Sequence, residues 1–251
     1  MPRHPALLDA DPLAPFPPVE QALRDPDGLL AVGGDLSPAR LLNAYAHGIF
    51  PWFSHGQPIL WWSPDPRMTF DTATFRLSSR LRRELRRSLW RVRADTAFDA
   101  VVAACAHAPR PGQDGTWIVP AMRRAYAELH RLGHAHSVEV WDGGELAGGI
   151  YGVMIGRMFF GESMFSARSG GSKVALAALA GFLHAHGCPL IDAQVENPHL
   201  LSLGARHLPR PLFMRQVRTL VAQPGPEGAW TARFGERPAA LLARPAAGQD
   251  V

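Results

Sequence analysis

The chain has 251 residues, of which 47% are hydrophobic, so it can form one large domain or two small ones around a proper core. Its only two cysteines lack CxxC spacing, which excludes a disulfide scaffold and a cysteine-ligated zinc site and favours a reducing, cytoplasmic compartment. No stretch approaches the roughly 18 consecutive apolar residues of a membrane span. The N-terminus also lacks the apolar core of a signal peptide, so we expect no contact with a membrane.

The first quarter of the sequence has the pattern of a small separate unit. Residues 1–20 are rich in proline and predict an irregular arm. Ser37 and Pro38 are typical of a helix N-cap and first helical position, and Gly48 predicts where that helix stops. Prolines cluster around Asp65, where we place a domain boundary. The predicted division is a small N-terminal domain at 1–65, a larger domain at 66–235 and a flexible tail at 236–251.

Tryptophans gather just before this boundary. Trp52, Trp61 and Trp62 lie within a short stretch that also contains several prolines. They could form a packed aromatic cluster where two units meet, or a platform on which a nucleic-acid base stacks. The sequence leaves both interpretations open.

The basic residues of the chain gather between residues 76 and 93. Eight arginines and one glutamate give this segment a net charge of +7, whereas the whole chain carries +4. Leucines at 77, 81, 85 and 89 recur every four residues and predict a helix with arginines on its other face. A solvated charged face is the alternative, but such faces normally mix signs, so a phosphate backbone is favoured. The arginines assigned to this contact are Arg76, Arg80, Arg82, Arg83, Arg86 and Arg87.

The second half of the chain predicts an α+β fold with one mixed sheet. Alternating apolar residues and tight turns predict a strand meander, which a buried helix and a further strand follow. The expected helices are 95–107, 120–132 and 173–185, and the expected strands are 136–141, 146–154, 157–161 and 190–195. This order resembles the acyl-CoA N-acyltransferase (GNAT) fold, in which such a helix packs across the sheet.

Three polar side chains stand out in this otherwise apolar half. Glu162 follows the third strand, and a carboxylate there is costly to keep charged unless it is paired. It either caps a turn or meets a structural arginine, or it serves a function. Asp192 and Gln194 alternate onto one face of the last strand, about 6.5 to 7 Å apart. They either tie the sheet to a helix or act together in chemistry. His134 and His136 have no nearby further ligand, so we expect no metal site.

Seven motifs in the same order are similar to those of one family, the leucyl/phenylalanyl-tRNA–protein transferases. The similarity runs from about residue 16 to residue 213 and leaves the tail outside. The motifs are Gly-Gly-Asp-Leu-Ser-Pro (33–38), Gly-Ile-Phe-Pro-Trp-Phe (48–53), Trp-Trp-Ser-Pro-Asp-Pro-Arg (61–67), Gly-Thr-Trp-Ile (115–118), Gly-His-Ala-His-Ser-Val-Glu-Val-Trp (133–141), Phe-Gly-Glu-Ser-Met-Phe-Ser (160–166) and Ile-Asp-Ala-Gln-Val (191–195).

The resemblance implies a bacterial, cytoplasmic enzyme with a small N-terminal domain and a GNAT-like catalytic domain. It would transfer Leu or Phe from aminoacyl-tRNA to the N-terminal Arg or Lys of an acceptor protein and mark that protein for N-end rule degradation. The aminoacyl ester is already activated, so no cofactor and no metal are expected. We also expect a monomer.

The resemblance also implies site residues. Glu162 would meet the basic side chain of the acceptor, and Asp192 and Gln194 would assist the transfer. Trp52 and Trp117 would hold the terminal adenosine, and the arginine segment would contact the tRNA backbone. An apolar pocket for Leu or Phe would be formed by Met164, Leu176, Leu179, Leu183 and Ile191.

An amide is not a strong general base. We therefore expect Gln194 to hydrogen-bond the attacking amine or the oxyanion, with Asp192 orienting it. Whether Asp192 itself takes the proton stays open.

Two other functions compete with this interpretation. An acetyl-CoA-dependent N-acetyltransferase would use residues 168–173, which precede a helix and could cradle phosphate through backbone N–H groups. A non-catalytic RNA-binding protein would use only the arginines and tryptophans.

Overall fold

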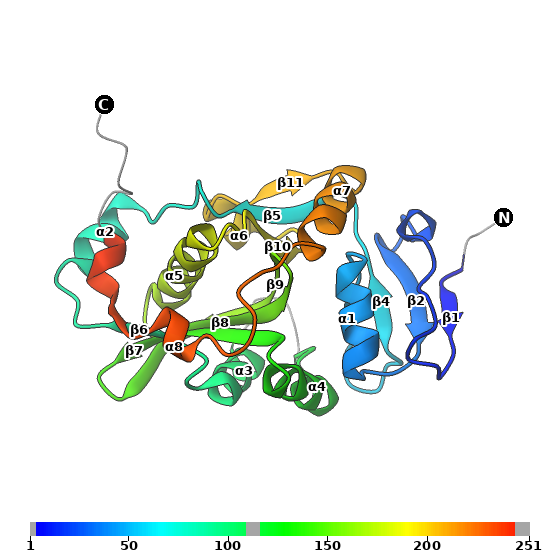
Figure 1. Cartoon of the computed structure of the whole chain (residues 1–251), viewed down its shortest axis with the longest axis horizontal. Coiled ribbons are helices and arrows are strands. Elements are labelled where there is room, and N and C mark those ends of the chain that lie inside the picture. The colour runs from blue at the N-terminus through cyan, green and yellow to red at the C-terminus, as the bar shows by residue number, and fades with distance from the viewer. Residues whose placement is uncertain (1–3, 109–115, 244–251) are drawn as a thin grey trace.

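The computed structural model describes residues 4–108 and 116–243. The described residues form two β-sheets, a small one near the N-terminus and a large mixed one that contains all the later strands (Figure 1). The small sheet has the order β1-β2-β4-β3. Its strands are β1 (Ala6–Leu8), β2 (Leu29–Gly33), β3 (Phe50–Pro51) and β4 (Leu60–Trp62).

Helix α1 (Pro38–Ala46) covers this sheet and ends against the rest of the molecule. Ser37 caps it by accepting a hydrogen bond from the backbone N–H of Arg40 at 3.3 Å, and Pro38 occupies the first turn. The helix stops just before Gly48, which has a φ of +68°. The predicted start and end of this helix are therefore confirmed.

The arm before α1 is less irregular than its proline content predicts. Residues Ala6–Leu8 pair in parallel with β2 as strand β1. The fully buried guanidinium of Arg40 donates hydrogen bonds to the backbone carbonyls of Asp9, Asp11 and Ala14. A charge buried in this way needs such partners, so it ties the arm to α1.

The large sheet has the strand order β11-β5-β10-β9-β8-β7-β6-β12. Strands β9 and β10 pair in parallel and the other neighbours are antiparallel, which confirms the predicted mixed sheet. Its strands are β5 (Arg67–Asp71), β6 (Arg91–Ala94), β7 (Ala135–Asp142), β8 (Glu145–Ile155), β9 (Met158–Ser166), β10 (Leu190–Gln194), β11 (Arg206–Leu208) and β12 (Arg237–Pro238).

Helices cover both faces of this sheet. Helix α5 (Gly171–Ala185) packs across one face, while α3 (Phe98–His107) and α4 (Pro120–Arg131) lie on the other (Figure 1). Alternate residues of β8 serve the two cores, since Ile150 faces the α5 side and Tyr151 the α3–α4 side. The remaining helices are η1 (Val19–Gln21), α2 (Ser79–Leu85), α6 (Pro198–Ser202), α7 (Arg210–Val221), α8 (Thr231–Phe234) and η2 (Ala239–Ala243).

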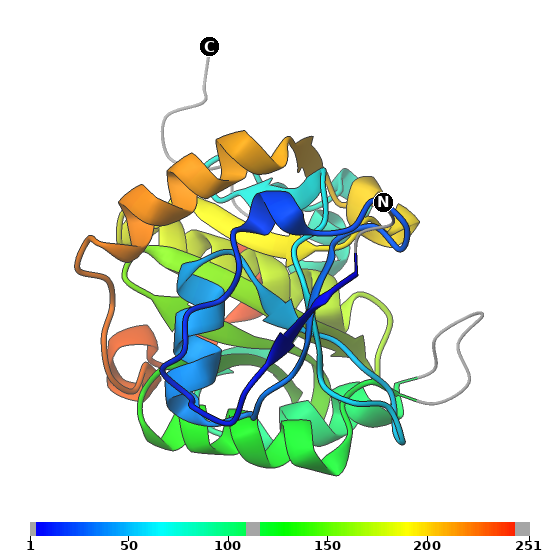
Figure 2. The ribbon, with the colours of Figure 1, turned by 90° about the vertical axis from the view of Figure 1, so that its right-hand side faces the viewer.

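The two sheets share one core. The apolar cluster on the α3–α4 side also contains Leu41, Tyr45 and Trp61 from the small unit. Figure 2 views the molecule from this unit, with the large sheet behind it. The small sheet ends at β4 and the large one begins with β5, close to the predicted boundary at residue 65. The domain limits themselves stay a prediction. Among the described residues, no helix is both long enough and apolar enough to span a bilayer.

The prediction of one helix through residues 76–93 is wrong. The helix, α2, spans only Ser79–Leu85, and Arg91–Ala94 instead forms β6 against β7. Leu81 and Leu85 are buried as the leucine spacing predicts, but the side chain of Leu89 is 88% exposed. The four-residue repeat therefore extends beyond the helix that it predicts.

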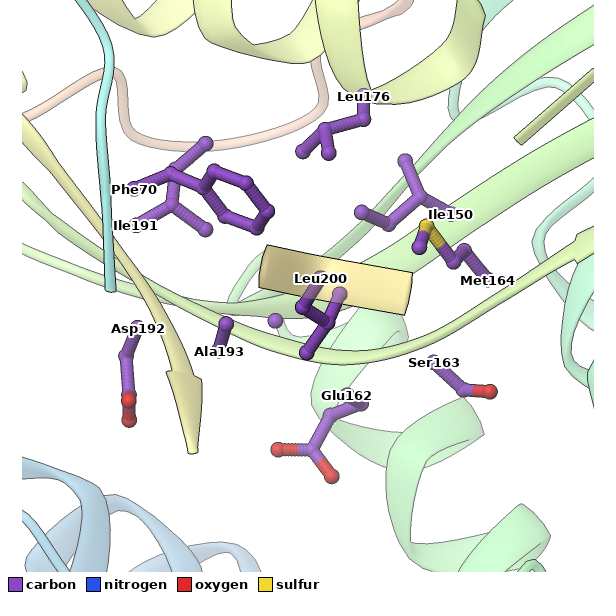
Figure 3. A pocket seen from close by; sticks show the side chains of 11 residues that line it. Phe70, Ile150, Glu162, Ser163, Met164, Leu176, Ile191, Asp192, Ala193 and Leu200 are labelled. Carbon is purple, nitrogen blue, oxygen red and sulfur yellow. The ribbon is translucent and has the colours of Figure 1, made fainter. Parts of the chain in front are cut away.

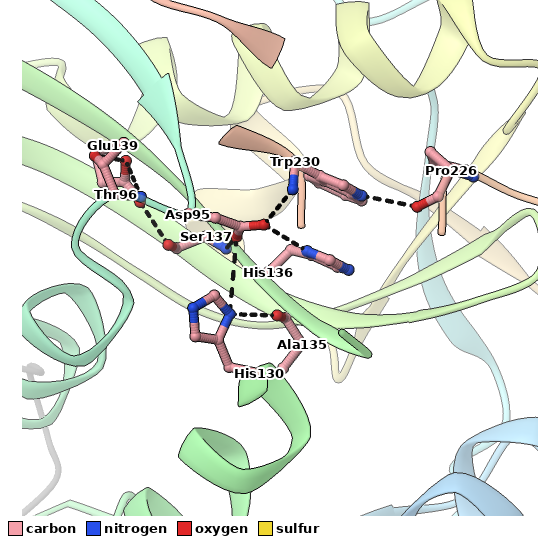
Figure 4. A network of polar contacts seen from close by, with 9 residues as sticks. All are labelled: Asp95, Thr96, His130, Ala135, His136, Ser137, Glu139, Pro226 and Trp230. Carbon is pink, nitrogen blue, oxygen red and sulfur yellow. Dashed lines mark hydrogen bonds and ion pairs between the residues drawn. The ribbon is translucent and has the colours of Figure 1, made fainter. Parts of the chain in front are cut away.

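The prediction of a flexible tail from residue 236 is wrong for residues 237–243. Strand β12 pairs with β6, and η2 buries Ala239 and Ala243. The segment that leads there is anchored by fully buried Trp230, whose backbone N–H donates to Asp95 and whose ring stacks on His136 (Figure 4). Residues 244–251 of the predicted tail lie outside the described residues.

Candidate active site

A single carboxyl group, that of Glu162, joins four elements of the fold. Strand β9 continues through it to Ser166, so Glu162 lies within a strand rather than after one. Its Oε1 accepts hydrogen bonds from the Tyr45 hydroxyl on α1 and from Nε2 of Gln194 on β10, both at 2.7 Å. Its Oε2 accepts one from the Tyr126 hydroxyl on α4 at 2.5 Å. These contacts bring together segments that are far apart in the sequence.

The two tyrosines also meet each other, with 2.8 Å between their hydroxyl oxygens. Burial and the nearby Glu162 charge raise the pKa of both well above its ordinary value, so the hydroxyls stay protonated and can donate. Neither tyrosine was predicted as a site residue from the sequence. The chain has three tyrosines, and the third, Tyr151, packs its ring against Tyr126 at 5.4 Å. A buried tyrosine hydroxyl needs a partner, which is the signal that could have found them.

Glu162 has the pKa of a group that titrates near neutral pH. Burial raises the pKa of this carboxyl to about 7. Hydrogen bonds from Tyr126, Tyr45 and Gln194 act in the opposite direction, and the charge of Asp192 raises the pKa further. Such a shift at the edge of a pocket is typical of a functional site.

The second carboxyl group, that of Asp192, forms a bidentate ion pair with Arg67. The guanidinium of Arg67 donates from Nε to Oδ1 at 2.8 Å and from Nη2 to Oδ2 at 2.7 Å, and both side chains are fully buried. Rings of Phe50 and Phe213 lie 4.7 Å from this guanidinium. Oδ1 of Asp192 also accepts the backbone N–H of Gln194 at 2.9 Å. Asp192 therefore positions the backbone of Gln194, while the Gln194 side-chain amide contacts Glu162.

The backbone turns sharply at Gln194. A bulge lies between Asp192 and Gln194 in the pairing with β5, and Gln194 has a φ of +62°, which is rare for a residue other than glycine. Such strain is stored most often at functional sites. Here it directs the Gln194 amide toward Glu162.

A pocket opens where β9 and β10 separate. Their pairing ends at Phe160 and Asp192, and the residues beyond line the opening. Figure 3 shows the carboxyl groups of Glu162 and Asp192 on one side of the sheet and apolar side chains, including Leu176, on the other. The apolar lining comprises Phe70, Ile150, Met164, Leu176, Ile191, Ala193 and Leu200.

Three of the five residues predicted for the apolar pocket line this opening, namely Met164, Leu176 and Ile191. Leu179 and Leu183 do not line this opening, although they belong to the same apolar cluster on the α5 side of the sheet. Their role in binding the donor side chain stays a prediction, because α5 is apolar nearly all round and its sequence does not reveal which turn meets the opening. Phe70, Ile150 and Leu200 were missed.

Comparison with known proteins identifies the family. One family model, described as leucyl/phenylalanyl-tRNA protein transferase, matches residues 69–218, and the model of its N-terminal domain matches residues 34–65. A leucyl/phenylalanyl-tRNA–protein transferase of Xanthomonas axonopodis pv. citri (strain 306) is 71% identical over 243 residues, which cover 96% of this chain and 98% of that protein. One of Xylella fastidiosa (strain 9a5c) is 62% identical over 233 residues, covering 93% and 96%.

The chain belongs to the leucyl/phenylalanyl-tRNA–protein transferase family. The family prediction made from the seven motifs is thereby confirmed. Similar solved structures are more distant. L-PGS from Bacillus licheniformis shares 11% identity with a TM-score of 0.36, covering 67% of this chain and 53% of that one, which is too remote to carry an argument.

The tryptophans of this transferase divide between core and surface. Trp61 is fully buried, whereas Trp52, Trp62 and Trp117 are half-buried at the edge of the shared core. Trp52 and Trp62 form an edge-to-face pair with 5.5 Å between their centroids. Nε1 of Trp62 donates to the carbonyl of Trp52 at 2.7 Å. Residues 109–115, which precede Trp117, lie outside the described residues.

The arginine segment keeps an exposed positive surface around α2. Arg91 and Arg93 form ion pairs with Glu236, with N–O distances of 2.8 and 2.6 Å. Arg80 pairs with Glu84 at 3.0 Å, although its side chain is 90% exposed. The six arginines predicted to contact tRNA are those that do not pair with Glu236, and all but Arg82 are exposed.

The start of α5 offers a poor phosphate cradle. The backbone N–H groups of Gly171 and Ser172 already donate, at 2.9 Å each, to the carbonyl of Arg168 and to Oγ of Ser166. A Cβ at Gly171 would lie 2.1 Å from the carbonyl oxygen of Ala147, so this glycine serves the close contact of α5 with β8. Among the described residues, no group of three or more potential metal ligands comes together.

Proposed function

We propose that this enzyme transfers a leucyl or phenylalanyl residue from aminoacyl-tRNA to the N-terminal Arg or Lys of an acceptor protein. Family membership makes the chain a tRNA-dependent aminoacyltransferase. The observation that supports the fuller proposal is the position of the Glu162 carboxyl at the edge of an apolar pocket. The proposal further includes a monomeric, cytoplasmic enzyme whose products enter N-end rule degradation.

The apolar pocket would bind the side chain of the donor amino acid. Its lining of Phe70, Ile150, Leu176 and Ile191 offers no charged group on the α5 side of the sheet. A charged side chain would lose its hydration there without gaining a partner, so the pocket selects Leu and Phe by desolvation. The acceptor would bind on the opposite side, where Glu162 faces it.

The transfer itself needs positioning more than strong acids or bases. An N-terminal amine has a reference pKa near 7.7–8.0, so an appreciable fraction is already neutral at pH 7. The amine nitrogen attacks the ester carbon, the C–N bond forms, the ester C–O bond breaks, and the proton lost by the amine ends on the ribose oxygen. Nε2 of Gln194 donates to Glu162, so the side-chain oxygen of Gln194 is left to accept a hydrogen bond from the attacking amine. Asp192 would act as a positioning residue, because Arg67 occupies both its oxygens.

The nucleic acid would bind at two places. Trp52 and Trp117 are half-buried and could stack on the terminal adenosine. The tRNA backbone would meet Arg76, Arg80, Arg82, Arg83, Arg86 and Arg87. The larger domain, proposed as residues 66–235, would have a GNAT-like fold, which the packing of α5 across the mixed sheet supports.

One experiment tests the reaction. Purified protein is mixed with Leu-tRNA and a peptide that starts with Arg, and the product mass is compared with that from acetyl-coenzyme A in place of tRNA. A gain of one leucyl residue with tRNA alone is expected. Acetylation without leucylation would make the chain an acetyltransferase. Leucylation of an Ala-starting peptide at the same rate would contradict the proposed acceptor preference.

A further inference from the structure

Three oxygen-bearing groups close a ring at the centre of the site. The Tyr45 hydroxyl lies 2.7 Å from Oε1 of Glu162, the Tyr126 hydroxyl 2.5 Å from Oε2, and the two hydroxyls 2.8 Å from each other. Each of these three contacts is short enough to require a proton between its two oxygens. The ring therefore has three places for hydrogen.

The ionised carboxylate leaves this ring one proton short. Each tyrosine hydroxyl supplies a single proton, and an ionised Glu162 only accepts. Two protons cannot fill three contacts, so one oxygen pair would face each other with lone pairs alone. A protonated Glu162 supplies the third. Oε1 then accepts from Tyr45 and Gln194 as before, the contact at Oε2 reverses so that Oε2–H donates to Tyr126, and Tyr126 donates to Tyr45.

We infer that the acceptor-free enzyme holds one proton within the ring of Glu162, Tyr126 and Tyr45, and that binding of a cationic acceptor residue releases this proton to solvent. The inference rests on the proposed function, since it assumes that the cation of the acceptor approaches Glu162. Tyr45 and Tyr126 become positioning residues that set the proton affinity of the site. The proton passes to the buffer, and the positive charge of the acceptor replaces it.

The charges around Glu162 fit this exchange. The titratable groups that act on it are Tyr45 from α1, Tyr126 from α4 and Asp192 from β10, and Tyr151 from β8 lies beside the two tyrosines. Tyr45 and Tyr126 stay neutral, and Arg67 neutralises Asp192. No cation among the described side chains pairs with Glu162, so burial favours its neutral form and its pKa is raised to about 7. An arriving guanidinium or ammonium would provide the missing counter-charge and lower that pKa.

The first test needs no substrate. Protein with ¹³C-labelled glutamate is titrated from pH 5 to pH 9 by NMR, and the Glu162→Gln variant identifies the Glu162 signal. We expect a midpoint near 7. In the Tyr126→Phe variant the midpoint of the Glu162 titration should move to higher pH. The charged carboxylate then loses a stronger hydrogen bond than the neutral acid does. A signal that is already ionised at pH 6 in the wild type would overturn the inference.

The second test measures the coupling to the acceptor. Affinities are compared at pH 6 and pH 8 for peptides that start with Arg or with citrulline, which has the same shape and α-amine but no charge. The affinity for the Arg peptide relative to the citrulline peptide should rise about tenfold from pH 6 to pH 8. At pH 6 a Glu162 with a pKa near 7 is about nine-tenths protonated and must lose its proton before the cation binds. A ratio that does not change with pH would overturn the coupling. Leucyl transfer from Leu-tRNA to the Arg peptide is measured at both pH values as well. If it does not occur at either, the proposed function fails instead, and the titration still decides whether the ring holds a proton.

Discussion

At the scale of single residues, the Arg67–Asp192 pair should support both stability and transfer. Asp192→Asn keeps the size of the side chain but leaves the Arg67 charge buried without its partner. We expect the free energy of unfolding to fall by about 3–5 kcal/mol, because an uncompensated buried charge is strongly destabilising. Urea unfolding measures the loss, and leucyl transfer should fall because an amide oxygen accepts the backbone N–H of Gln194 more weakly than a carboxylate oxygen does.

Glu84→Gln is the matched control for this prediction. It breaks an ion pair of similar length with Arg80, but this pair lies at the surface. Exposed pairs contribute little, so its unfolding curve should overlay that of the wild type. If both variants unfolded at the same urea concentration, burial of the Arg67–Asp192 pair would not be what makes it important.

The sequence revealed the polar residues of this site better than their partners. Glu162, Asp192 and Gln194 stood out because each is polar within an apolar stretch. Their partners could not be read in the same way. Tyr45 is 117 positions from Glu162, and Arg67 is 125 from Asp192. Local pattern shows that a side chain is buried, but tertiary packing decides which group it meets.

At the scale of elements, α2 shows how packing overrides periodicity. The leucine repeat continues to Leu89, yet the residues after Ser88 also alternate as a strand would. Pairing of β6 with residues 138–141 of β7 satisfies backbone hydrogen bonds that a longer surface helix would leave unpaired. By contrast, α1, α3, α4 and α5 were predicted within a few residues, because caps, glycines and prolines mark their ends.

The contact between α5 and β8 should not tolerate a side chain at Gly148. A Cβ there would lie 2.4 Å from the carbonyl carbon of Gly171. We expect Gly148→Ala to lower the free energy of unfolding by about 1–3 kcal/mol, as overpacking does. Gly181→Ala is the control, since nothing lies within 4 Å of its Cβ and alanine favours the helix. Thermal unfolding of both variants decides, and equal melting temperatures would contradict the prediction.

The arginines of α2 and its flanks should carry the affinity for tRNA. The triple variant Arg80→Glu, Arg83→Glu and Arg87→Glu should weaken tRNA binding by at least about tenfold at low salt, and the affinity should then depend less on salt concentration. The control reverses three exposed arginines elsewhere, at positions 123, 215 and 218, with the same change in net charge. Filter binding over a salt series compares the two. Equal losses would mean that total charge, and not this surface, attracts the tRNA.

At the scale of the whole molecule, the active site exists only where separate parts of the chain meet. Tyr45 comes from the small unit, Tyr126 from α4 and Glu162 from the middle of the large sheet. The C-terminal segment adds β12 as an edge strand beside β6, at the end of the sheet away from β11. The sequence predicted the two units and the mixed sheet, but not this edge strand, because Ala, Pro and Gly after residue 235 have the composition of a loose tail.

Asp95 is the group that ties this C-terminal segment to the sheet. Its carboxylate accepts hydrogen bonds from Nδ1 of His136 at 2.8 Å, from the backbone N–H of Trp230 at 2.7 Å and from that of Ser137 at 3.0 Å. His130 lies 3.9 Å away (Figure 4). Burial acts to raise the pKa of Asp95, but these partners hold it below its ordinary value of 3.8.

The stability of the protein should therefore depend on the ionisation of Asp95 in acid. Because folding lowers this pKa, the ionised group stabilises the protein above about pH 4 and loses that effect as the pH falls through the folded pKa. Asp95→Asn should be less stable than the wild type at pH 7, and its stability should fall less steeply between pH 5 and pH 3. Urea unfolding across this range gives both slopes. Parallel slopes would mean that the hydrogen bonds anchor Trp230 without favouring the charge.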